Sequence, residues 1–282
     1  MPKLKVPSQA SLMATEVREI NSRQTGKKYH ICIGLPYDMY DAKPKLTWPV
    51  VYLLDANFYF GMVSDMVRSM AWCGSTQDAI VVGITYPVVG TPWTAWQQIT
   101  GLRAHDLTPE QSDRDAKEDS DMAGRKVQNG GAPAFLKFIR DELMPVIEKD
   151  YRANPVHKIL AGHSYGGLFA LFALFQEPGL FQAYIASSPT IRFKDSVMFE
   201  HESQFAKRRK KLPAQVHLSI GELEEDAEIG GVSNLYRLVA LLESRKYKGL
   251  SLVRRVFPGE DHCSVIAPAF QAGLKMALAK QT

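Results

Sequence analysis

The sequence predicts an α/β fold in which a mostly parallel central sheet is flanked by helices, within a single domain over residues 1–282. Short continuous apolar runs alternate along the chain with segments whose apolar residues recur every three or four positions. Continuous apolar runs are typical of strands buried on both faces, as in a parallel sheet covered by helices. Their alternation with helical segments predicts right-handed crossovers. No internal repeat or low-complexity linker divides the chain.

The first predicted strand, Tyr29–Ile33, differs from the others because its side chains alternate in polarity. Such alternation indicates a strand with one buried face, antiparallel or near an edge. Three continuous apolar runs then predict buried strands, and three more segments have a suitable length and composition. These six segments are Val50–Leu54, Ala79–Ile84, Ile159–Ala161, Phe181–Ala186, Val216–Ile220 and Leu250–Val256.

Apolar stripes with a period near 3.6 residues predict three helices between and after these strands. The first stripe covers residues 135–147, where Pro145 predicts a kink or a break in the helix. The other two stripes consist of Leu235, Leu238, Leu241 and Leu242, and of Ile266, Phe270, Leu274 and Leu278.

Residues 87–131 have no sustained period. They contain three prolines, two tryptophans and the charged stretch SDRDAKEDSD. A connection of this length inside a compact domain is usually functional or mobile. We therefore expect an irregular, lid-like insertion above the sheet, with a flexible charged middle.

Charge patterning argues against a nucleic-acid partner. The 282 residues suffice for a large core, and the net charge of +4 is small. The basic run KRRKK at 207–211 predicts a solvated helix end, because no aromatic-rich basic face or nucleic-acid motif accompanies it.

Apolar and cysteine content bears on the cellular compartment. The N-terminal residues lack the apolar segment of a signal peptide, and no stretch approaches 18 apolar residues. The chain has three cysteines, Cys32, Cys73 and Cys263. Their odd number and wide spacing favour reduced thiols over disulfides or a zinc site. We expect a cytoplasmic protein without a membrane span, although removal of a leader would leave the same sequence. Oligomeric state is left open.

The pentapeptide GHSYG, at 162–166, separates a predicted buried strand from an apolar helical segment and fits the pattern G-x-S-x-G. In such an elbow the serine, here Ser164, adopts a strained backbone at a sharp turn, and the flanking glycines avoid overlap with strand and helix. The following amide N–H groups point into the same space as the hydroxyl and provide half of an oxyanion site. A glycine-rich turn with an incidental serine is the alternative.

A serine nucleophile needs a base within hydrogen-bond distance and an acid that orients the base. His262 follows the last predicted strand in a turn-rich loop that opens a helix. In the chain order serine, acid, histidine, this position lies at the same end of the sheet as Ser164. Of the other histidines, His105 and His201 are expected in irregular or connecting sequence. A helix-capping role is the alternative for His262.

The acid is expected directly after the predicted strand Val216–Ile220, where four carboxylates lie within five positions. Side-chain alternation does not select among them, because it holds for strands and not for loops. The candidates are Glu222, Glu224, Glu225 and Asp226.

Five segments, in order, resemble those of a known family. They are YLLD at 52–55, RAHDLTP at 103–109, GGAPAFL at 130–136, GHSYGGL at 162–168 and DHCSV at 261–265. On these segments the chain resembles, from about Tyr29 to Leu278, the esterases of the α/β-hydrolase fold that include enterobactin-type siderophore esterases. The resemblance implies Ser164 as nucleophile, His262 as base and Glu224 as acid.

The same resemblance implies that the oxyanion is held by the backbone N–H groups of Tyr165 and Asn57. The second donor follows a strand that ends in Leu-Asp-Gly in the family. Here Ala56 stands where glycine is usual, which bears on the local backbone geometry.

The insertion contains three candidate pocket residues. Trp93, Trp96 and Arg103 suit aromatic or anionic substrate groups through stacking and charge. The favoured alternative for Arg103 is an ion pair with Asp106 that pins the insertion, and the tryptophans fit equally well as core anchors.

We therefore expect a serine carboxylic ester hydrolase that acts on a small-molecule ester through an acyl-enzyme intermediate, without a metal or an organic cofactor. A siderophore trilactone esterase is the main alternative. An acyltransferase and a non-catalytic binding homologue are the others.

Overall fold

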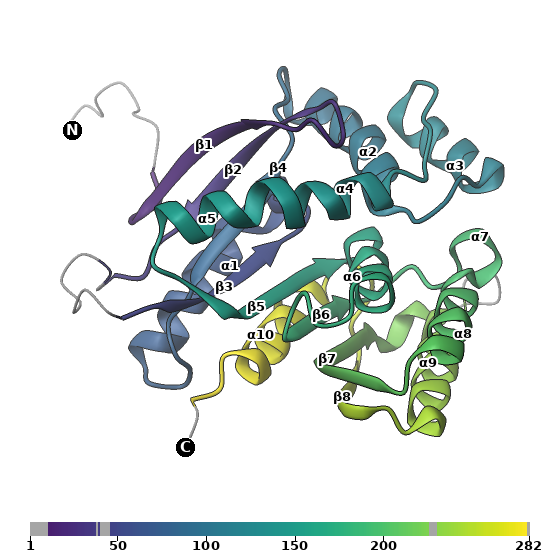
Figure 1. The fold of residues 1–282 in the computed structure, drawn as a ribbon. Coiled ribbons are helices and arrows are strands. Elements are labelled where there is room, and N and C mark those ends of the chain that lie inside the picture. Colours follow the sequence, from purple (N-terminus) through teal and green to yellow (C-terminus); the bar gives the residue numbers. More distant parts are fainter. Residues whose placement is uncertain (1–10, 38, 40–45, 226–229, 281–282) are drawn as a thin grey trace.

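The computed structural model describes residues 11–37, 39, 46–225 and 230–280, and an eight-stranded sheet forms its centre (Figure 1). The strand order is β1-β2-β4-β3-β5-β6-β7-β8. The strands are β1 (Thr15–Asn21), β2 (Lys28–Gly34), β3 (Trp48–Leu53), β4 (Ile80–Thr85), β5 (Ala153–His163), β6 (Ala183–Ser187), β7 (Lys211–Gly221) and β8 (Lys248–Phe257).

The sheet is parallel from β4 to β8 and antiparallel at its β1–β2 end. The prediction of a mostly parallel sheet is confirmed. The prediction that Tyr29–Ile33 forms an antiparallel or near-edge strand is also confirmed, because β2 pairs antiparallel with both neighbours and lies one position from the edge. Edge strand β1 was not predicted. Its sequence, TEVREIN, is largely exposed and carries little apolar signal.

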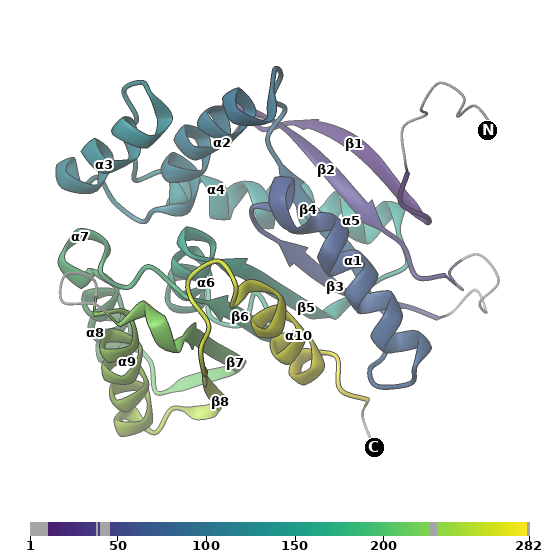
Figure 2. The same ribbon diagram turned by 180° about the vertical axis from the view of Figure 1, so that it is seen from behind.

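Helices cover both faces of the sheet (Figures 1 and 2). Val51 and Leu53 of β3 join one apolar cluster with α1 and α10, whereas Val50 and Tyr52 join the cluster on the other face. This two-sided burial explains the continuous apolar runs. The first layer contains α1 (Ala56–Trp72) and α10 (Ile266–Ala277), and the second contains α4 (Ala132–Phe138), α5 (Met144–Asp150), α6 (Tyr165–Gln176), α8 (Met198–Arg208) and α9 (Gly231–Arg245).

The helix predicted over 135–147 is interrupted as expected near Pro145. A π-helical turn, η1 (Ile139–Leu143), separates α4 from α5. Proline has no N–H to donate, and a π turn changes the hydrogen-bond register directly before it. The basic run 207–211 ends α8 and is exposed, as predicted.

The prediction that residues 87–131 are irregular is wrong, because helices α2 (Pro92–Leu107) and α3 (Asp113–Ala123) occupy most of this segment. Both helices begin with a side-chain cap. The hydroxyls of Thr91 and Ser112 each accept a hydrogen bond from the backbone N–H three residues later in the chain. The charged middle forms α3 and buries Asp115 and Asp119. A short helix whose buried positions hold carboxylates shows no apolar period, which is why the pattern missed it.

Two histidines also lie elsewhere than expected. His105 is in α2 and His201 in α8, both regular helices. No helix in the described ranges is long and apolar enough to cross a membrane.

Candidate active site

Ser164 lies at the sharp turn between β5 and α6 with φ 58° and ψ −119°. An ideal Cβ on Gly162 would lie 2.5 Å from the carbonyl carbon and oxygen of Gly166. Glycine is therefore required at 162. At Gly166 the contact is looser, 3.3 Å from Asp55 Oδ2, whereas a Cβ on Gly167 would lie 2.9 Å from Ser187 O. The turn is sterically determined, mainly by Gly162 and Gly167.

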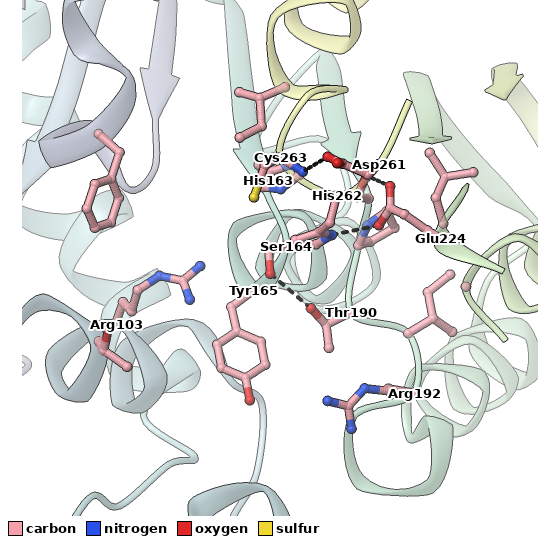
Figure 3. A pocket seen from close by; sticks show the side chains of 18 of the residues that line it. Arg103, His163, Ser164, Tyr165, Thr190, Arg192, Glu224, Asp261, His262 and Cys263 are labelled. Carbon is pink, nitrogen blue, oxygen red and sulfur yellow. Dashed lines mark hydrogen bonds and ion pairs between the residues drawn. The ribbon is translucent and has the colours of Figure 1, made fainter. Parts of the chain in front are cut away.

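His262 lies in the loop between β8 and α10, and its Nδ1 is 2.6 Å from Glu224 Oε2. Figure 3 shows the His262 ring between Ser164 and Glu224. Of the other candidate acids, Glu222 accepts from the Gly259 N–H and Glu225 from Ser233. Asp226 lies outside the described residues.

Hydrogen bonds keep Glu224 ionised. Burial by itself would raise its pKa, but donors at His262, Ser188 and the Gly221 amide together lower that pKa below its ordinary value. The buried neighbour His163 behaves differently, because desolvation, and then the nearby His262, lower its pKa well below the usual value. His163 is therefore neutral, and the two rings lie 4.5 Å apart.

Ser164 and His262 line one cavity of about 780 Å³, a size typical of small-molecule sites. Among the described residues, the hydrogen-bond partner of Ser164 Oγ is Thr190 Oγ1 at 3.3 Å. Catalytic hydrogen bonds are often long or poorly aligned before substrate binds. The geometry therefore places hydroxyl, imidazole and carboxylate around one solvent-accessible space.

The two candidate oxyanion donors lie in the first turns of two helices. Tyr165 is the first residue of α6 and Asn57 the second of α1. N–H groups at these positions have no intrahelical acceptor. Asn57 is pinned through its side chain, which donates to Tyr86 O at 3.0 Å and accepts from Tyr86 N at 2.8 Å.

Alanine at position 56 fits this backbone. The left-handed residue is the preceding Asp55, with φ 51°, whereas Ala56 begins α1 and does not have a positive φ. Its methyl group lies against Gly83, where a Cβ would come within 2.8 Å. The departure from the family's glycine thus falls where no glycine conformation is needed.

The predicted ion pair between Arg103 and Asp106 is wrong. Arg103 makes a bidentate contact with Asp55, with both N–O distances 2.8 Å. Asp106 is fully buried and contacts Lys27 and Tyr29 instead. Although the two residues are three apart on α2, one side chain reaches the end of β3 and the other reaches β2.

The three candidate pocket residues differ in position. Arg103 and Trp96 line the cavity. Trp93 is absent from its lining; it is 63% exposed and stacks on Trp96 with ring centroids 5.0 Å apart. Arg192 lines the opposite side (Figure 3), and it was not predicted.

The last residue of β6 and the segment that follows it contribute contacts that sequence reasoning missed. Ser187 O accepts the Ser164 N–H at 2.9 Å, Ser188 Oγ donates to Glu224, and Thr190 contacts Ser164. A usable signal existed. The sequence SSPT follows a buried strand next to the elbow strand, and ligand sites in parallel sheets form at such carboxyl ends.

Asp119 of α3 links the insertion to the elbow, since Tyr165 Oη lies 3.3 Å from both its carboxylate oxygens. Burial raises the pKa of Asp119 from 3.8 to about 6, although the bond from Tyr165 opposes this. A raised folded-state pKa means that stability is highest below the unfolded value and is lost as pH rises through 6.

We therefore expect Asp119→Asn to stabilise the protein by about 1–3 kcal/mol at pH 8 and to have no such effect below about pH 4. Urea unfolding at several pH values measures this. Asp121→Asn, on an exposed position of the same helix, is the control and should change little. A gain independent of pH would contradict the assignment.

A serine on a strand–helix elbow, a histidine after the last strand and a glutamate after β7, on a mostly parallel sheet, define a serine hydrolase of the α/β-hydrolase fold. Residues 22–263 match the family described as "Putative esterase", and the chain belongs to it.

Relatives that are named as esterases agree with this class. The ferri-bacillibactin esterase BesA of Bacillus subtilis (strain 168) is 32% identical over 274 residues, covering 95% of this chain and 91% of that protein. The siderophore triacetylfusarinine C esterase of Aspergillus fumigatus is 29% identical, with 89% of each covered. The crystal structure of the BES protein from Bacillus cereus superposes with a TM-score of 0.82 at 29% identity, covering 98% of this chain and 100% of that one. The protein is thus a serine hydrolase acting on esters.

Proposed function

We propose that this protein hydrolyses siderophore esters through an acyl intermediate on Ser164. The observation that carries the proposal is the 2.6 Å contact between His262 and Glu224 beside the cavity that Ser164 lines. The relatives named as siderophore esterases supply the substrate class.

In the proposed reaction the Ser164 hydroxyl turns from Thr190 toward His262. Its oxygen attacks the ester carbonyl while His262 takes the proton, and Glu224 stabilises the resulting imidazolium. The oxyanion accepts from the amides of Tyr165 and Asn57, and loss of one such donor typically costs about 2.7–4 kcal/mol of barrier.

The tetrahedral intermediate then collapses. The C–O bond to the alcohol breaks and His262 returns the proton to the departing oxygen. Water, deprotonated by the same imidazole, attacks the acyl carbon, and the acid leaves as Ser164 regains its proton. The proposal needs no metal or organic cofactor at any step.

The cavity suits a bulky substrate with aromatic or anionic groups. The guanidinium of Arg103 lies over the Tyr165 ring, 5.2 Å from its centroid, and Trp96 also lines the cavity. Helices α2 and α3 supply part of this lining, which supports our inference that they cover the active site of a single domain.

A comparison of substrates tests the proposal. We expect a catechol-bearing trilactone to have a higher kcat/KM than a short-chain chromogenic ester, and a fluorophosphonate to label Ser164. Preference for the short ester would instead indicate a general carboxylesterase. Faster acyl transfer to an added alcohol than to water would indicate an acyltransferase. If the fluorophosphonate does not label Ser164, the protein is a non-catalytic binding homologue.

We also infer that the protein works in a reducing compartment such as the cytoplasm. Cys32, Cys73 and Cys263 are free thiols, and the last two are exposed, which supports this inference.

A further inference from the structure

Glu224 lies on a short turn beside the cavity. It ends a three-residue 3-10 turn, η2 (Glu222–Glu224), directly after β7, and its side chain is 9% exposed. The imidazole that it contacts is 49% exposed. The hydrogen bonds of the carboxylate show what orients it between the imidazole and the sheet.

Those bonds divide between its two oxygens. Oε1 accepts from Ser188 Oγ at 2.7 Å and from the Gly221 N–H at 2.8 Å, and Oε2 contacts His262 Nδ1 at 2.6 Å. Gly221 belongs to the same turn as Glu224. Ser188 comes from the end of β6, so it ties the carboxylate to a separate part of the sheet.

Ser188 is held firmly in place. It has a φ of 40°, in the left-handed region that costs free energy for any residue with a Cβ, and it is 2% exposed. Its N–H donates to Ser219 O at 2.7 Å. Strained residues persist where their surroundings determine them and occur preferentially at functional sites. The strain here places a hydroxyl beside the acid.

We propose that Ser188 is a positioning residue that holds the Glu224 carboxylate so that Oε2 faces His262. The proposal rests on the proposed function, in which Glu224 orients the base. It explains how one acid among the neighbouring carboxylates is committed to the imidazole: its other oxygen is already saturated by two donors.

Ser188→Ala removes the hydroxyl and keeps the backbone. We expect kcat to fall about 10-fold to 100-fold, since hydrogen bonds to charged groups are among the stronger ones, with KM unchanged. The acid limb of the kcat/KM profile should move to lower pH, because a carboxylate that is free to turn away from His262 stabilises the imidazolium less. That limb belongs to the coupled groups Glu224, His262 and neighbouring His163.

Two variants accompany this one. Ser188→Gly also lacks the hydroxyl but accepts a positive φ without strain, so it tests the contact even if the alanine variant folds poorly. Ser219→Ala is the matched control. Its hydroxyl is fully buried on the adjacent strand and has no hydrogen-bond partner within the described part of the chain. It should retain wild-type kcat and pH profile.

Equal loss in the alanine and glycine variants, with the shifted acid limb, supports the proposal. Wild-type kcat in either variant overturns it, as does the same loss in Ser219→Ala. Ser164→Ala, assayed in parallel, separates the two levels of inference. Retained activity in that variant refutes the proposed function, whereas its loss together with an unaffected Ser188→Ala refutes only the positioning role.

Discussion

Ser164→Ala is expected to lower kcat for ester hydrolysis by at least about 10⁴-fold. The variant lacks the oxygen that forms the acyl intermediate, so only oxyanion stabilisation and substrate binding remain. Its fold should persist, because alanine occupies the same volume at the same backbone position and Gly162 still provides the close approach to Gly166.

The measurement is initial-rate hydrolysis of a chromogenic ester, together with substrate affinity and thermal unfolding. Affinity and melting temperature near those of wild type show that the loss is chemical. A rate within ten-fold of wild type would mean that the elbow serine is incidental.

Arg103→Ala is expected to lower the free energy of unfolding by about 3–5 kcal/mol. The Asp55 side chain is 1% exposed and Arg103 holds both its oxygens. Burial opposes the charge on Arg103, but Asp55 outweighs this and raises the pKa of the guanidinium. Removing the arginine therefore leaves a buried carboxylate without its cation.

Urea unfolding measures the loss. The informative control is Arg103→Met combined with Asp55→Asn, which removes both charges and keeps a residue tolerant of the left-handed backbone at φ 51°. It should recover most of the stability. A single-variant loss below about 1 kcal/mol would show that the pair is as weak as an exposed one.

The sheet and the elbow were predictable because their causes are local. A strand that is buried on both faces appears in the sequence as a continuous apolar run. The close approach of Gly162 to Gly166 within one turn appears as two glycines at a fixed spacing. The insertion was misread for the opposite reason. In α3 the buried positions include Asp115 and Asp119, which contact the distant residues Lys194 and Tyr165, so the apolar periodicity is too weak to detect.

The sequence by itself determined the fold class, the position of Ser164 on its turn and the placement of His262 after the last strand. It narrowed the acid to four neighbours, and the resemblance pointed to Glu224. Only the tertiary structure decided which carboxylate contacts the imidazole, that Arg103 pairs with Asp55, and that Ser188 and Thr190 adjoin the site. The physical reason is the range of the forces involved. Strand burial and turn sterics act within a few residues, whereas hydrogen-bond and ion-pair partners are brought together from distant segments by packing of the whole sheet.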